Sequence, residues 1–106
     1  GEVSELAWEI LHHGANAAVA VDDAYALEAM RTLAFPATGQ PAIVAGETGG
    51  TGLAALLAAR DHPGIRETLG LDDRSTVLLL GSEGDTDPRI YLEVVGRTAE
   101  EVLDEV

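Results

Sequence analysis

Three short apolar runs alternate with stretches patterned as helices, and this alternation limits the possible folds of the chain more than any other feature. The runs cover residues 17–21, 42–45 and 75–80. None shows the apolar-polar alternation of a half-exposed strand, so each is typical of a strand buried on both faces. Buried strands separated by helices favour a parallel sheet. The sequence therefore predicts an α/β fold, with a short parallel sheet flanked by helices.

Capping residues and prolines mark the ends of the helices between these runs. Ser4 is a typical N-cap for a first helix that stops before Gly14, where a left-handed residue is favourable. Thr98 and Glu101 have the spacing of a capping box, which predicts a last helix. The other signals are Asp22 before a helix to about Ala34, the helix-like run at 53–60, Pro63 and Gly70 around a short helix, and Asp87, Pro88 and Gly96 around another.

Composition excludes several classes of partner. The formal net charge is −13, with 19 acidic residues against six basic ones, all arginine. Such a charge repels nucleic acid and anionic membrane surfaces. No apolar run approaches the roughly 20 residues that span a bilayer. With neither cysteine nor a leader-like segment, we expect a cytoplasmic protein, and 106 residues fit a single domain.

Two glycine-rich loops follow predicted strands at their carboxyl ends, where α/β proteins bind ligands. They cover residues 46–52 and 81–86. The first precedes a helix, whose N-terminal N–H groups favour an anion such as phosphate or carboxylate. The alternative is a tight turn that needs glycine only for close packing. Glu47 in this loop either caps the helix or meets a polar edge of a ligand.

Neither metal binding nor serine hydrolysis is supported by the sequence. Acidic residues alternate over 83–87, yet Pro88 occupies the position where a calcium loop requires glycine, and Val94 the position of its closing glutamate. The three histidines have no metal-ligand spacing, and no cysteine is present. No Gly-x-Ser-x-Gly elbow occurs. We therefore expect no metal site.

Five segments, in this order and spacing, resemble diaminopropionate ammonia-lyases. The most specific is Glu83-Gly84-Asp85-Thr86-Asp87-Pro88, and Gly46-Glu47-Thr48-Gly49 is moderately specific. The other three are Gly1-Glu2, Ala7-Trp8-Glu9-Ile10-Leu11 and Ala29-Met30-Arg31. The resemblance covers nearly the whole chain.

The resemblance implies that residues 1–106 form a single domain or subdomain at the C-terminal end of a pyridoxal-phosphate (PLP) enzyme. The fold would be that of the C-terminal part of the PLP-binding large domain in fold type II, the tryptophan-synthase-β-like family. The complete enzyme would eliminate ammonia from 2,3-diaminopropionate and yield pyruvate. The resemblance also implies that the Schiff-base lysine lies upstream, and this chain contains no lysine. The chain alone is thus expected to be inactive, with the upstream portion and other copies as partners and an amino acid as substrate.

The resemblance also implies which residues face the cofactor. The loop residues Gly46, Glu47, Thr48 and Gly49 would lie near the edge of the pyridine ring rather than its phosphate. Ser82 would face the ring nitrogen with a neutral hydroxyl, and a register shifted by one residue would place Gly81 there instead. Asp85 competes for this role, whereas Asp87 is expected to cap a helix. No catalytic residue of the family falls within this chain.

Two alternatives remain open at this level. One is a non-catalytic binding or regulatory module that keeps the glycine loops as a site for an amino acid or small anion. The other is an acidic interaction domain with a basic partner and no small-molecule site.

Overall fold

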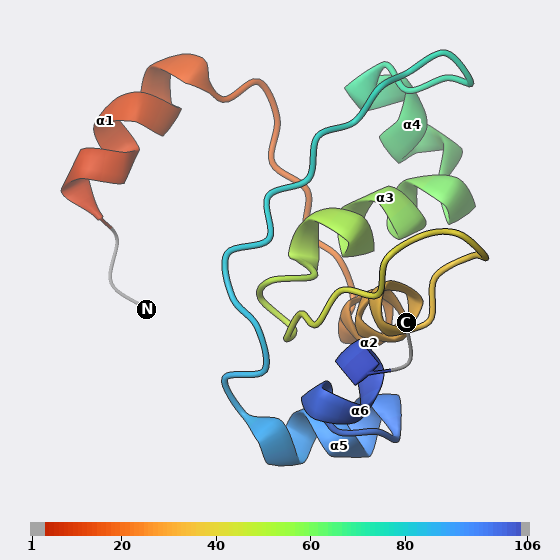
Figure 1. The fold of residues 1–106 in the computed structure, drawn as a ribbon. Coiled ribbons are helices and arrows are strands. Elements are labelled where there is room, and N and C mark those ends of the chain that lie inside the picture. The colour runs from red at the N-terminus through yellow and green to blue at the C-terminus, as the bar shows by residue number, and fades with distance from the viewer. Residues whose placement is uncertain (1–3, 105–106) are drawn as a thin grey trace.

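Helices joined by segments without regular secondary structure make up residues 4–104, the part of the chain described by this computed structural model (Figure 1). The helices are α1 (Glu5–Gly14), α2 (Asp23–Ala34), α3 (Thr51–Asp61), α4 (Pro63–Leu69), α5 (Pro88–Val95) and α6 (Ala99–Asp104).

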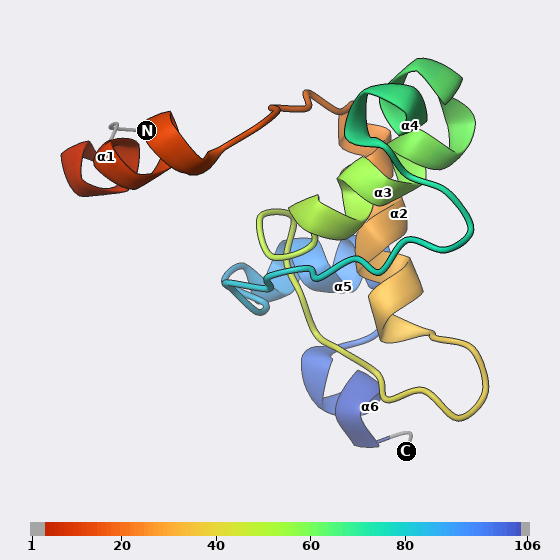
Figure 2. The ribbon, with the colours of Figure 1, turned by 90° about the horizontal axis from the view of Figure 1, so that it is seen from above.

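The helices from α2 onward pack in a chain of neighbours around a small core. α2 contacts α3 and α5, α3 contacts α4, and α5 contacts α6. α1 stands to one side of the others, as two perpendicular views agree (Figures 1 and 2). The buried cluster at the centre joins α2, α5 and α6, and consists of Met30, Ala34, Tyr91, Val95 and Val102. Burial of these apolar side chains is what holds the three helices together.

The first helix forms where expected but packs on little. The Ser4 side chain caps it by accepting a hydrogen bond from the Ala7 backbone N–H at 3.2 Å. None of its residues is buried. Gly14 is the last residue of the helix and is not left-handed, and the C-cap is Ala15 with φ −76°, so the expected left-handed end at Gly14 is wrong.

Local signals at the other helix ends are largely confirmed. Gly70 and Gly96 end α4 and α5 with φ of 68° and 84°, a conformation in which glycine carries no steric penalty. The capping box closes in both directions: Thr98 N–H donates to Glu101 Oε1 at 3.0 Å, and Glu101 N–H to Thr98 Oγ1 at 3.2 Å. Asp22 precedes α2 as expected, although its side chain makes no capping hydrogen bond.

The predicted parallel sheet is absent from residues 4–104, so the α/β assignment is wrong. The apolar runs at 17–21, 42–45 and 75–80 lie outside helices, but no ladder of hydrogen bonds joins them. Ile43, for example, donates its N–H to the carbonyl of Leu33 at the end of α2. The third run is not buried either, since Leu78 and Leu80 are 84% and 79% exposed. Apolar composition made these runs look like strands, but a strand also needs a paired neighbour.

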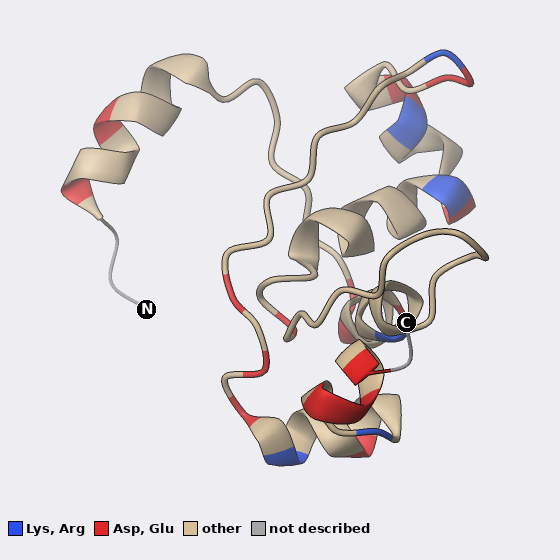
Figure 3. Cartoon of the chain, in the orientation of Figure 1, with Lys and Arg blue, Asp and Glu red and all other residues tan. Residues whose placement is uncertain are grey.

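Within residues 4–104, no helix is long and apolar enough to cross a bilayer. Acidic side chains gather on α6 and on the segment that leads into α5, while arginines are scattered, some at α3, α4 and the turn after it (Figure 3). The motif Gly1-Glu2, on which part of the family resemblance depends, lies outside the described residues.

Candidate functional site

The two glycine-rich loops pack directly against each other. A Cβ atom at Gly49 would clash with the backbone carbonyl oxygen of Glu83. A Cβ at Gly46 would lie 2.6 Å from Glu83 Oε1 and 2.7 Å from the Gly84 carbonyl oxygen. Both distances are shorter than any normal contact of a Cβ atom. Glycine is therefore required here for the close approach of two backbones, which is the packing explanation considered for the first loop.

A cavity of about 230 Å³ opens between these loops, α2 and α5. Its walls carry four acidic residues, Glu47, Glu83, Asp85 and Asp87, and Met30 and Tyr91 contribute from the core. No ion pair joins these four carboxylates to an arginine within residues 4–104. The cavity is consequently acidic, and no arginine of the described residues forms an ion pair with its walls.

Tyr91 has an unusual position at the edge of this cavity. Its side chain is 1% exposed, and its hydroxyl has no hydrogen-bond partner among the described residues. Burial raises the pKa of Tyr91, and the nearby Asp85 charge raises it further. The phenol thus stays protonated and lies within electrostatic reach of Asp85. A buried hydroxyl without a partner is uncommon in native proteins, because it loses its hydrogen bonds to water without replacing them.

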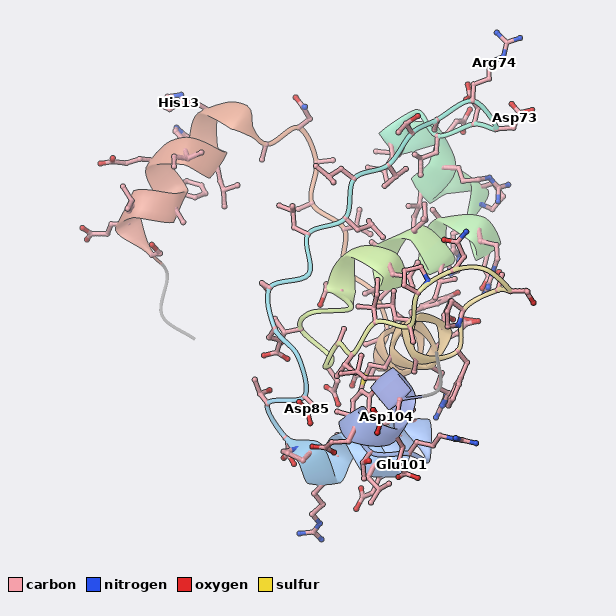
Figure 4. The ribbon with its side chains drawn as sticks, viewed as in Figure 1. His13, Asp73, Arg74, Asp85, Glu101 and Asp104 are labelled. Atoms are coloured by element: carbon pink, nitrogen blue, oxygen red, sulfur yellow. The ribbon has the colours of Figure 1, made fainter. Side chains whose placement is uncertain are left out.

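The structure brings four of the six predicted cofactor residues to this cavity. Gly46, Glu47, Thr48 and Asp85 line it, and Gly49 and Ser82 do not. Gly46 and Gly49 are buried, Glu47, Thr48 and Ser82 are exposed, and Asp85 is half-buried. Figure 4 shows Asp85 on the segment before α5, far from Asp73 and Arg74 at the opposite end of the molecule.

Glu47 does not cap α3 with its side chain. The N-cap is Gly50, and no side chain makes a capping hydrogen bond there. Instead, the Thr51 hydroxyl donates to the Glu47 backbone carbonyl at 3.0 Å. Glu47 also shares a second cavity, of about 260 Å³, with Asp22 and Asp23. Three carboxylates around the α3 N-terminus oppose an anion there, so the phosphate interpretation of this loop loses its electrostatic support.

Asp87 is committed to capping, as expected. Its Oδ1 accepts a hydrogen bond from the Ile90 backbone N–H at 3.2 Å and begins α5. Among residues 4–104, no three histidine, aspartate or glutamate side chains converge in a way that could hold a metal ion.

Sequence reasoning missed a polar cluster between α2 and α3. The Tyr25 hydroxyl donates to Asp61 Oδ2 at 3.0 Å and lies 3.3 Å from His62 Nε2. Arg60 pairs with Asp61 at 2.9 Å and with Glu28 at 3.2 Å. The cluster borders a cavity of about 620 Å³, to which Tyr25 and His62 contribute. Apart from the adjacent Arg60 and Asp61, its partners lie 32 to 37 positions apart, so no local motif predicts it.

We expect this cluster to stabilise the folded state only at pH values where Asp61 is ionised. The Arg60 guanidinium and then the Tyr25 hydroxyl lower the pKa of Asp61 to about 2. Because the folded-state pKa lies below the ordinary value of 3.8, the contribution is complete above that value and is lost as the pH falls towards 2. The free energies of unfolding of the parent and of Asp61→Asn, measured with urea, should therefore differ at pH 5 and become equal near pH 2. If the difference between the two free energies stayed constant over this range, ionised Asp61 would not be the source of the stabilisation.

Comparisons with known proteins show that the chain is similar to one portion of the diaminopropionate ammonia-lyases, in both sequence and structure. Diaminopropionate ammonia-lyase of Escherichia coli K12 is 40% identical over 98 residues, which cover 90% of this chain and 25% of that protein. The Salmonella typhimurium enzyme is 32% identical over 105 residues, covering 93% of this chain and 26% of the relative. No family model matches the chain.

Solved structures agree with the sequence comparison. The crystal structure of apo diaminopropionate ammonia-lyase from Escherichia coli has a TM-score of 0.79 at 40% identity, covering 90% of this chain and 27% of that one. The selenomethionine-containing holo form gives a TM-score of 0.77 at 39% identity, with 86% and 24% covered.

This chain is therefore a homologue of one portion of the diaminopropionate ammonia-lyases, and the resemblance found in its motifs is confirmed. It spans about a quarter of the length of the curated relatives it matches.

Proposed function

We propose that this chain is the C-terminal part of a PLP-dependent ammonia-lyase, which eliminates ammonia from 2,3-diaminopropionate and yields pyruvate. The observation that carries the proposal is the joint likeness in sequence and structure, at 40% identity and a TM-score of 0.79 over 90% of the chain. In this proposal, residues 1–106 are one structural part of a larger enzyme, and only the complete enzyme is active.

The residues of this chain fit one side of the cofactor only. A Schiff base requires a lysine amine, and the sequence contains none. The loops around Gly46 and Ser82 offer small or hydroxylic groups instead. Neither the Thr48 nor the Ser82 hydroxyl is engaged by a side-chain hydrogen bond within residues 4–104, so both remain able to meet a polar edge of the ring. The fit is therefore to the pyridine side, and the anchoring lysine must come from elsewhere.

We assign the pyridine side of the cofactor to the six residues that the motifs indicate. They are Gly46, Glu47, Thr48, Gly49, Ser82 and Asp85. When bound, PLP would supply an electron sink for cleavage next to the amino-acid α-carbon. A neutral hydroxyl at Ser82 would leave the ring nitrogen without the carboxylate that keeps it protonated in stronger sinks. That suits elimination better than transamination.

The proposal assigns the uncovered apolar surface to contacts with the upstream portion of the enzyme and with further copies. Helix α1 exposes Leu6, Trp8 and Ile10 by 72%, 57% and 68%. An isolated helix of ten residues is marginal in water, so α1 needs another surface to pack on. The exposed run with Leu78 and Leu80 presents a second such surface.

A reconstitution experiment tests the proposal. The chain is mixed with the lysine-bearing upstream portion and PLP, and visible absorbance and pyruvate release from 2,3-diaminopropionate are recorded. We expect a Schiff-base band and pyruvate in the mixture, and neither from this chain with PLP alone. Ser82→Ala is a matched variant that should change the position or pH dependence of the band rather than abolish it.

Two results would contradict the proposal. If a folded upstream portion binds this chain, yet the mixture with PLP yields neither band nor pyruvate, the assignment to a PLP lyase fails. If the upstream portion alone is fully active, this chain is not a required part of the site.

A further inference from the structure

None of the residues in the motif Ala29-Met30-Arg31 belongs to the cofactor contacts proposed above, although the family resemblance partly depends on this motif. The motif lies in the second half of α2, and α2 contacts α3 and α5 and lies between them in Figure 1. Ala29 and Met30 are 0% and 1% exposed. Two of the three side chains are therefore enclosed by the rest of the chain.

Ala29 supports the first glycine loop. A Cβ atom at Gly50 would lie 3.6 Å from the Ala29 Cβ, so the Gly50 backbone lies directly against this side chain. The Gly50 N–H donates to the Gly46 carbonyl at 2.9 Å and closes the loop on itself. The first loop is therefore held in place on α2.

Arg31 supports α5, the helix that follows the second glycine loop. The Arg31 Nε donates to the carbonyl oxygen of Val94 at 2.9 Å. Val94 lies in the last turn of α5, where the carbonyls lack partners within the helix. Met30 packs in the same buried cluster as Tyr91 and Val95 of α5. One turn of α2 thus holds α5 both by packing and by a hydrogen bond.

We propose that Arg31 is a positioning residue, which fixes the 81–86 loop relative to the first glycine loop through its hydrogen bond to α5. A helix of eight residues moves as a nearly rigid body, because backbone hydrogen bonds close its turns. The 81–86 loop is joined to the start of α5 by Asp87, whose side chain caps the helix. A displacement of α5 at Val94 is therefore transmitted to the loop.

The consequence for the cofactor rests on the proposed function. The 81–86 loop carries Ser82 and Asp85, which that proposal assigns to the pyridine side of PLP, and the first loop carries the other assigned residues. Arg31 does not line the cavity between the loops, so it acts only through their relative position. Its loss changes how well both loops meet one cofactor at the same time.

Two substitutions separate the hydrogen bond from the charge. Arg31→Gln keeps an N–H donor at the same number of bonds from the backbone, whereas Arg31→Met places a methyl group there. Both remove the positive charge, and arginine, glutamine and methionine have similar helix propensities. Arg89→Met is the matched control, because Arg89 lies on α5 itself but pairs with Glu93 of the same helix, at 3.7 Å.

The first measurement needs no cofactor. Amide hydrogen exchange of the full-length protein that contains these residues is followed by mass spectrometry. We expect exchange over residues 81–91 to be at least about threefold faster in Arg31→Met than in the parent, the effect of one net hydrogen bond. Arg31→Gln and Arg89→Met should match the parent. Exchange over α3 should stay unchanged in all variants, which distinguishes a displaced loop from general destabilisation.

The second measurement follows PLP binding to the same proteins through the visible Schiff-base band. The Kd for PLP should rise at least about threefold in Arg31→Met, because the two loops no longer meet the ring together. The pH at which the band titrates should shift as well. Arg31→Gln and Arg89→Met should again match the parent in both respects.

Three results would overturn the proposal. They are equal exchange over residues 81–91 in Arg31→Met and the parent, equally fast exchange in Arg31→Gln and Arg31→Met, and unchanged PLP binding in Arg31→Met when the parent gives the band. If the parent itself gives no band, the proposed function fails instead, and the exchange measurement alone decides whether Arg31 positions the loop.

Discussion

Replacing Gly49 with alanine should destabilise the protein by about 3 kcal/mol, at the upper end of the range for overpacking a tight site. The added methyl group would be forced into the backbone carbonyl of Glu83. A flexible side chain could rotate away, but a carbonyl oxygen moves only if its whole loop moves. We therefore expect a large decrease in the urea concentration at the midpoint of unfolding, measured by circular dichroism. The 81–86 loop should also be displaced.

Gly64→Ala is the matched control for this change. Gly64 lies in α4, and a Cβ built there meets no atom within 4 Å. Because alanine also reduces the freedom of the unfolded chain, this variant should be neutral or more stable by up to about 1 kcal/mol. Equal destabilisation by the two variants would show that the contact between the loops is not what requires glycine at position 49.

Truncating Met30 to alanine should cost about 2–5 kcal/mol, the usual range for a large buried side chain. Met30 is 1% exposed and sits in the cluster that joins α2 to α5 and α6. Its removal leaves a void between helices that have few other buried side chains to replace the lost contacts. Thermal and urea unfolding should both shift, and complete loss of the native signal at 25 °C would also meet the expectation.

Leu78→Ala provides the comparison for Met30. It also removes a large apolar side chain, but one that is 84% exposed. For this chain alone, we expect a change within about 0.5 kcal/mol, as for most surface substitutions. If Leu78→Ala were as damaging as Met30→Ala, the buried cluster would not be the main source of stability.

Helix positions could be predicted well because their signals are local. Ser4, Asp87 and the pair Thr98 and Glu101 each make the capping hydrogen bond that their spacing indicates. The partners lie three residues apart, so the sequence contains the whole interaction. The family motifs were recognisable for the same reason, since each is a short contiguous segment.

The sheet prediction failed because a strand is a relation between distant segments. The runs at 42–45 and 75–80 have apolar composition, yet pairing depends on what lies beside them in space, and that is set by tertiary structure. The unexpected polar cluster around Tyr25 and Asp61 depends equally on the docking of two helices.

The candidate site likewise has some features that are local in the sequence and others that depend on tertiary structure. The sequence by itself determined the helix ends, the two glycine loops, the kinship with ammonia-lyases and the lack of an anchoring lysine, because all of these are properties of short segments or of composition. Only the tertiary structure decided that Gly49 meets Glu83, and that Tyr91 is buried without a partner beside Asp85. Those contacts join residues that are brought together by helix packing. Packing depends on the whole chain, so it cannot be predicted from any single segment.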